Sequence, residues 1–115
     1  MRLGHIELFC FDTAITKRFF TGGLGFEIVV EQPGGYVWLQ TAQIEILLRP
    51  NLQPQVPANS YQDADQALVI YTENLDQSRL NLEAAGIEFK GTDGSPTCLI
   101  FQDPDGRWYQ LVEHD

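Results

Sequence analysis

The chain has 115 residues and a formal net charge of −9, and 43% of its residues are hydrophobic. This length fits one compact domain, and the composition is typical of a globular protein. The negative charge argues against binding to nucleic acid or to an anionic membrane, because either partner would repel the protein. We expect a cytoplasmic protein, since no segment has the roughly 20 apolar residues of a membrane helix and the N-terminus does not resemble a signal peptide. Two cysteines, Cys10 and Cys98, are too few for a disulfide framework, so we expect buried, reduced thiols.

The first predicted element is a strand over residues 5–11, because two sets of side chains alternate there with a period of two. One face carries Ile6, Leu8 and Cys10, and the other carries His5, Glu7, Phe9 and Phe11. We expect the aliphatic face to lie against a core.

A short helix is predicted next. Asp12 or Thr13 is placed to cap its N-terminus, and the helix should run to about Thr21. Ile15 and Phe19 are four residues apart, so we expect both on its buried side.

The glycines within residues 22–25 mark the end of this helix, since helix C-termini often require a positive φ angle. Three strands are then predicted at residues 26–31, 36–41 and 43–49, the last two joined by a tight hairpin. Residues 50–66 contain three prolines among polar side chains, which predicts an extended connector.

The same pattern returns in the second half of the chain. A strand is predicted over residues 67–72, followed by a helix that Asn74 caps and Gly86 ends. The buried stripe of this helix should comprise Leu75, Ser78, Leu82 and Ala85. Three more strands are predicted at residues 87–90, 97–102 and 108–113, with the Asp-Pro-Asp-Gly turn of residues 103–106 joining the last two.

The chain therefore has the order βαβββ twice, with an offset of about 60 residues, which is an internal repeat. The predicted fold class is α+β, in one domain made of module one (residues 4–49), the connector (50–66) and module two (67–113). We expect each sheet to give its aliphatic face to its helix. The opposite face, which carries His, Glu, Trp and Tyr side chains, should curve around a cavity.

Three segments carry a resemblance to a known family. Residues 5–12 look like its opening strand and cap, residues 19–27 like its Leu-Gly-Phe passage after an aromatic helix, and residues 103–106 like its closing turn. In their order, spacing and duplication the chain resembles the glyoxalase / bleomycin-resistance / extradiol-dioxygenase superfamily, also called vicinal oxygen chelate proteins. The similarity extends over essentially the whole chain.

The resemblance implies that each module is a half-barrel and that the modules face each other around a metal or a ligand. At this length it implies a homodimer in which modules from both chains complete each pocket. The family's metal ligands come from the first and last strands of each module, which here gives His5 and Glu45 in module one and Ala67 and Gln110 in module two.

This set of donors is incomplete. The imidazole of His5 and the carboxylate of Glu45 are good ligands for a borderline divalent ion. Ala67 supplies no donor, and Gln110 offers a neutral amide in place of the glutamate that acts as base in the family's lyases. The cofactor alternatives are a divalent ion in an incomplete site (Zn, Ni, Mn or Fe) or no metal.

A further set of side chains should line the cavity because of the alternation along their strands. The predicted ligand-binding residues are Glu7, Tyr36, Trp38, Leu47, Arg49, Tyr71 and Trp108. Aromatic surfaces with a few polar groups suit an aromatic or amphipathic small molecule. The alternative is that the aromatic residues pack a dimer interface and that Arg49 pairs with a surface acid.

Three functions stay open at this point. The first is a small-molecule binding protein of the bleomycin-resistance kind, without a catalytic metal. The second is a metal-dependent lyase or dioxygenase-like enzyme that uses His5, Glu45 and Gln110. The third is a degenerate module whose dimer interface is its function. The missing donor at Ala67 favours the first over the second.

Overall fold

The computed structural model describes residues 1–114, which fold as two compact units. Unit 1 comprises Met1–Gln55, and unit 2 begins at Val56. Each unit has its own sheet and its own α-helix. None of the helices within residues 1–114 is long and apolar enough to cross a membrane.

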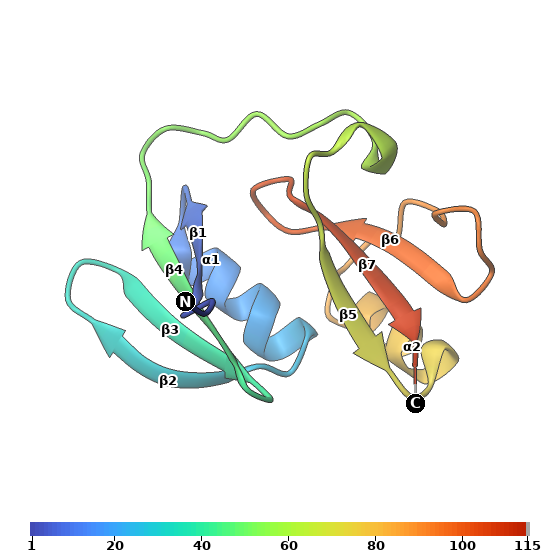
Figure 1. Ribbon diagram of the computed structural model, residues 1–115, viewed down its shortest axis with the longest axis horizontal. Coiled ribbons are helices and arrows are strands. Elements are labelled where there is room, and N and C mark those ends of the chain that lie inside the picture. Colours follow the sequence, from blue (N-terminus) through green and yellow to red (C-terminus); the bar gives the residue numbers. More distant parts are fainter. Residues whose placement is uncertain (115) are drawn as a thin grey trace. The chain divides into compact units, whose positions relative to one another are not determined.

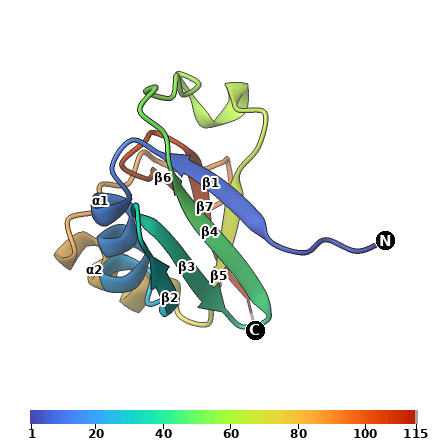
Figure 2. The ribbon, with the colours of Figure 1, turned by 90° about the vertical axis from the view of Figure 1, so that its left-hand side faces the viewer.

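Unit 1 has the order βαβββ. Its elements are β1 (Ile6–Cys10), α1 (Thr13–Arg18), a π-helical turn (Phe19–Gly23), β2 (Glu27–Gln32), β3 (Tyr36–Thr41) and β4 (Ile44–Pro50). The four strands lie in the order β1-β4-β3-β2, with β1 parallel to β4 and the other pairs antiparallel (Figures 1 and 2). The Asp12 carboxylate accepts hydrogen bonds from the backbone N–H groups of Ala14 and Ile15, so the predicted N-cap is confirmed.

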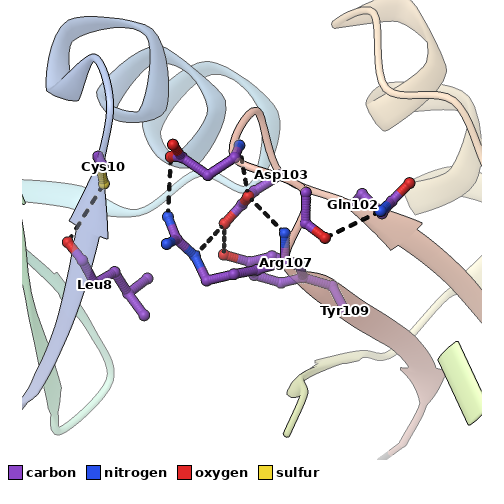
Figure 3. A network of polar contacts seen from close by, with 8 residues as sticks. Leu8, Cys10, Gln102, Asp103, Arg107 and Tyr109 are labelled. Atoms are coloured by element: carbon purple, nitrogen blue, oxygen red, sulfur yellow. Dashed lines mark hydrogen bonds and ion pairs between the residues drawn. The ribbon is translucent and has the colours of Figure 1, made fainter. Parts of the chain in front are cut away.

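One face of the unit 1 sheet forms the core, as the alternation predicts. Its buried side chains are Leu8 and Cys10 of β1, Val37 and Leu39 of β3, and Ile46 and Leu48 of β4. The Cys10 Sγ donates to the carbonyl of Leu8 at 3.4 Å, a contact that Figure 3 includes. The opposite face is left to the polar and aromatic side chains of the same strands.

The predicted buried side of the first helix is wrong. Ile15 is 43% exposed, whereas Thr13, Thr16 and Phe20 are buried. These three residues are spaced three and four apart and so share one helical face. Small threonine side chains let the helix lie close to the rest of the unit: a Cβ placed on Gly35 would lie 3.1 Å from the Thr13 hydroxyl oxygen.

Unit 2 has a three-stranded sheet. After a single 3-10 turn (Tyr61–Asp63) come β5 (Leu68–Thr72), α2 (Leu75–Ala84), β6 (Cys98–Gln102) and β7 (Trp108–Glu113). The strand order is β5-β7-β6, with β5 parallel to β7 and β6 antiparallel to it. Asn74 caps α2 as predicted, by accepting a hydrogen bond from the Gln77 N–H. In the predicted stripe Leu75 and Leu82 are buried, but Ala85 is exposed.

The strand predicted at residues 87–90 is reduced to an isolated bridge between Phe89 and Phe101. Two hydrogen bonds extend it, from Lys90 N–H to the Ile100 carbonyl and from Ile100 N–H to the Gly91 carbonyl. Gly91 has a φ of 102°, which is outside the range of a regular β-strand. The segment lies where a fourth strand would, and the α+β architecture of two βαβββ-like modules is confirmed.

Candidate functional site

The sheet face of unit 1 opposite α1 gathers most of the predicted site residues. The register pairs Glu7 with Leu47 and Phe9 with Arg49 between β1 and β4, and Leu47 with Trp38 between β4 and β3. These residues therefore lie side by side across three neighbouring strands. Six side chains of this face form what we call the aromatic–polar cluster, namely His5, Glu7, Phe9, Tyr36, Trp38 and Arg49.

Glu7 is the centre of this cluster. One of its carboxylate oxygens lies 2.8 Å from the His5 Nε2, and the other accepts a hydrogen bond of 2.9 Å from the Arg49 Nη1. The hydrogen bond from Arg49, and then that from His5, lowers the pKa of Glu7 below its usual value of 4.5. The same contact raises the pKa of Arg49. The sequence predicts Glu7 only as a pocket-lining residue, although its position two residues from His5 on one face is the signal for their contact.

Aromatic rings surround the charged groups. The Arg49 guanidinium carbon lies 5.8 Å from the ring centre of Phe9 and 5.7 Å from that of Tyr36, within the range of cation–π attraction. The His5 ring meets the Trp38 ring edge-on at 4.8 Å, and the Trp38 indole N–H donates to the side-chain oxygen of Gln32. Leu47 is buried between its neighbours, at 6% exposure. The cluster thus combines a fixed cation, a fixed carboxylate and three aromatic rings.

Two of the three predicted metal ligands, His5 and Glu45, belong to unit 1, and the third, Gln110, belongs to unit 2. Ile6 pairs with Ile46, which places His5 and Glu45, the residues just before them, at neighbouring positions on parallel strands. However, the His5 Nε2 contacts Glu7, and Glu45 is exposed. Residues 1–114 contain no group of three or more His, Cys, Asp or Glu side chains arranged to hold a metal ion. Within unit 1, the donors at the predicted positions are therefore the His5 imidazole and the Glu45 carboxylate.

Gln110 is buried in unit 2, and its amide nitrogen donates to the carboxylate of Asp93. Ala67, at the start of the first strand of this unit, offers no donor atom. Asp93 is a residue that the sequence reasoning missed. It lies in the loop between α2 and β6, where no spacing or periodicity points to a contact with β7.

The two aromatic site residues predicted in unit 2 have different surroundings. Trp108 is buried, its indole N–H donates to the Ala58 carbonyl at 2.9 Å, and its ring meets Tyr61 edge-on at 6.4 Å. The connector segment of residues 57–61 therefore covers Trp108. Tyr71 is 64% exposed and stacks on His114 with ring centres 4.3 Å apart.

The turn of residues 103–106 holds a buried polar network whose details the sequence did not predict. In Figure 3 dashed lines join Asp103 to Arg107 and to Tyr109: its Oδ2 accepts hydrogen bonds of 2.7 Å from both the Arg107 Nε and the Tyr109 hydroxyl. Its Oδ1 accepts from the backbone N–H groups of Asp105 and Arg107. Burial, together with the Asp103 charge, raises the pKa of Tyr109 well above 10.0. All the acceptors of Asp103 are thus used within the hairpin, which indicates a structural role.

A shallow recess of about 250 Å³ lies at the β3–β4 hairpin end of unit 1. Its lining residues are Gly25, Glu27, Gln40, Thr41 and Ala42. It contains no residue of the aromatic–polar cluster, so it is separate from the predicted ligand-binding residues.

Comparisons with known proteins agree with this geometry. The model of the "Glyoxalase/Bleomycin resistance protein/Dioxygenase superfamily" matches residues 2–111. The chain belongs to this superfamily. The resemblance predicted from the sequence is therefore confirmed. This chain is also 24% identical to the uncharacterized protein YetH of Bacillus subtilis, over 97% of this chain and 98% of that protein.

Solved structures of other proteins have the same fold as this chain. The fosfomycin resistance protein FosX of Listeria monocytogenes is 20% identical, with a TM-score of 0.77 over 96% of this chain and 90% of its own. A lactoylglutathione lyase from Agrobacterium tumefaciens is 19% identical, with a TM-score of 0.71 over 97% of this chain and 92% of its own. A mutant of FosX was solved in complex with Mn(II) and 1S,2S-dihydroxypropylphosphonic acid. At these identities the likeness shows a shared fold and not a shared activity.

Proposed function

We propose that this superfamily member binds a small aromatic or amphipathic molecule in the cavity enclosed by its half-barrels, with an incomplete metal site. The observation that carries this proposal is the aromatic–polar cluster of unit 1. Its charged groups are held by one another, through Glu7 to His5 on one side and to Arg49 on the other. Its aromatic rings remain partly open, since Phe9 is 44% exposed.

Such an arrangement is suited to binding because little has to be ordered when the ligand arrives. Immobilising a flexible side chain costs about 0.5–1.5 kcal/mol on association, and side chains that are already held avoid that cost. Aromatic side chains with a small number of placed polar groups are also the usual lining of small-molecule sites. Leu47, Tyr71 and Trp108 stay predicted ligand-binding residues.

The test is a titration with aromatic compounds followed by the NMR signals of the two indole N–H groups and of the backbone. We expect the Trp38 indole signal to shift on binding. Phe9→Ala should weaken binding about tenfold, which corresponds to about 1.4 kcal/mol of lost contact. Leu80→Ala is the control, because Leu80 is a similarly exposed apolar residue on α2, at 54%. If no aromatic compound moves any signal of the cluster at millimolar concentration, the binding proposal fails.

We propose a homodimer as the state in which the pockets are completed, in keeping with the length of the chain. Sedimentation equilibrium would measure the mass directly, and a monomer at the concentrations used for ligand binding would contradict the dimer. The cytoplasmic location stays a prediction of the sequence.

A divalent-metal-dependent lyase or dioxygenase is the second candidate. The neighbouring positions of His5 and Glu45 on parallel strands favour it, since imidazole and carboxylate together suit a divalent ion. Gln110 would be the third donor. Elemental analysis of gently purified protein should then find a near-stoichiometric ion (Zn, Ni, Mn or Fe) that His5→Ala removes. If the purified protein contains no divalent ion and none can be added to it, the enzyme candidate fails and the metal-free binding function is the one that remains.

A further inference from the structure

The guanidinium of Arg49 is the best-positioned cation on the open face of unit 1. Glu7 holds its Nη1 at 2.9 Å, and the rings of Phe9 and Tyr36 lie on it at 5.8 and 5.7 Å. An isolated surface ion pair contributes little and leaves the arginine mobile. Here the carboxylate and two rings fix the same group, so its orientation is set before a ligand arrives.

Arg49 retains capacity for a second partner. A guanidinium has five N–H donors; the hydrogen bond to Glu7 uses the Nη1 group, and the Tyr36 side chain also interacts with the guanidinium. The side chain is 42% exposed, so the remaining donors can be reached. A planar fork of N–H groups matches a carboxylate, which can accept two hydrogen bonds at once.

The charges around Arg49 permit an anion there. Glu7, the nearest acid, is itself compensated by both Arg49 and His5. Glu45 lies four residues before Arg49 on β4, which corresponds to about 13 Å along a strand. That distance exceeds the screening length of about 8 Å at physiological ionic strength, so the repulsion from Glu45 is weak.

Aromatic side chains lie beside Arg49 on the neighbouring strand β3. Tyr36 and Trp38 are alternate residues of β3, and Trp38 in turn contacts the ring of His5. A flat, apolar ligand body could therefore lie along this row while an attached anionic group reaches the guanidinium. An anion without a ring would make no contact with the row of aromatic side chains. A neutral aromatic compound would make no ionic contact with Arg49.

We infer that the ligand is an aromatic carboxylate, whose carboxylate docks on Arg49 and whose ring lies on the row formed by Tyr36 and Trp38. This inference rests on the proposed binding function and specifies its ligand class. Glu7 acts as the positioning residue, because it holds the guanidinium from the side away from the ligand.

The experiment compares four probes by NMR titration at about 0.15 M ionic strength. Naphthoate carries both the ring and the anion, naphthylmethanol is its neutral counterpart, naphthylmethylamine is cationic, and acetate lacks the ring. We expect naphthoate to bind at least about tenfold more tightly than each of the other three, the difference that one charge-assisted contact in a partly exposed site supplies. The largest shifts should come from the Trp38 indole and from the backbone around Arg49.

Two substitutions locate the anion site. Arg49→Met should abolish the preference for naphthoate over naphthylmethanol, and Arg49→Lys should retain part of it, because lysine keeps the charge but loses the planar fork. The matched control is Arg79→Met. Arg79 also pairs with one carboxylate, that of Glu83, and its side chain is 43% exposed, but it lies on α2. Thermal unfolding checks that each variant is folded. If Arg49→Met does not fold, a reduced preference for naphthoate in Arg49→Lys provides the test.

Equal affinities for naphthoate and naphthylmethanol would overturn the carboxylate inference and leave the binding function standing. A preference that survives Arg49→Met would overturn the role of Arg49. Acetate binding as tightly as naphthoate would overturn the role of the aromatic row. If none of the three naphthyl compounds binds, the proposed binding function itself fails.

Discussion

The connector contacts the β6–β7 turn at Gly106, and replacing this glycine by alanine tests that contact. Gly106 has a φ of +88°, and a Cβ at this position would lie 2.6 Å from Pro57 Cγ and 2.9 Å from Pro57 Cβ. Ordinary van der Waals contacts of a Cβ begin near 3.4 Å. Gly106→Ala therefore introduces both a strained backbone conformation and a steric overlap.

The two effects have separate magnitudes. A left-handed conformation costs a non-glycine residue about 1–2 kcal/mol. Overpacking of a closely fitted contact costs about 1–3 kcal/mol. We therefore expect Gly106→Ala to lower the free energy of unfolding by about 2–5 kcal/mol. Gly86→Ala isolates the first effect, because Gly86 has a φ of +90° and no atom within 4 Å of its Cβ position.

Urea unfolding measures these changes as shifts of the midpoint at constant slope. A double-mutant cycle with Pro57→Gly removes both overlapping carbons, so that Gly106→Ala in this background should cost only the backbone strain. The reasoning is refuted if Gly106→Ala costs no more than Gly86→Ala, or if its cost is the same with and without Pro57. The contact bears on the site, because the residue after Pro57, Ala58, accepts the indole hydrogen bond of Trp108.

Three further predictions concern the charged groups and the hairpin. Tyr109→Phe removes a buried hydrogen bond to Asp103 and should cost about 1.5–3 kcal/mol in urea unfolding at neutral pH. Because burial and Asp103 raise the pKa of Tyr109 well above 10.0, the unfolded chain loses this proton first as the pH rises. The native stability should therefore fall by up to about 1.4 kcal/mol per pH unit above pH 10, and the Phe variant should lack that contribution. Ala42 has a φ of 49°, so Ala42→Gly should raise the free energy of unfolding by about 0.5–1 kcal/mol in the same measurement. The hydrogen bond from Arg49 is the main cause that lowers the pKa of Glu7 below 4.5. The ionised Glu7 therefore stabilises the fold above pH 4.5, and this contribution is lost as the pH falls. In a carboxyl ¹³C titration, Arg49→Met should raise the titration midpoint of Glu7.

Two of the predicted metal ligands, His5 and Gln110, have polar partners in the structure. His5 contacts Glu7, and Gln110 donates to Asp93, so each of these polar side chains has a partner within its own unit. No buried side-chain nitrogen or oxygen within residues 1–114 lacks a hydrogen bond.

The sequence by itself determined the features that depend on local periodicity and local hydrogen bonding. The alternation of β1 and β3 correctly separated buried residues such as Leu8 and Val37 from the open face, because a strand turns every second side chain to the same side. The N-caps at Asp12 and Asn74 were predictable because a cap bonds to an N–H group only two or three residues away. The family followed from the order of such signals, and the match over residues 2–111 confirmed it.

Tertiary structure decided what depends on partners distant in sequence. The helix turned Thr13 and Thr16 to the core and left Ile15 exposed, because close approach to the sheet favoured small side chains over hydrophobicity. The carboxylate that contacts His5 is that of Glu7, and Arg49, which contacts the same carboxylate, lies 42 residues away in the chain. Periodicity shows which face a side chain occupies. The pairing register of the strands and the folding of the connector determine which side chains meet there, and those contacts make the site.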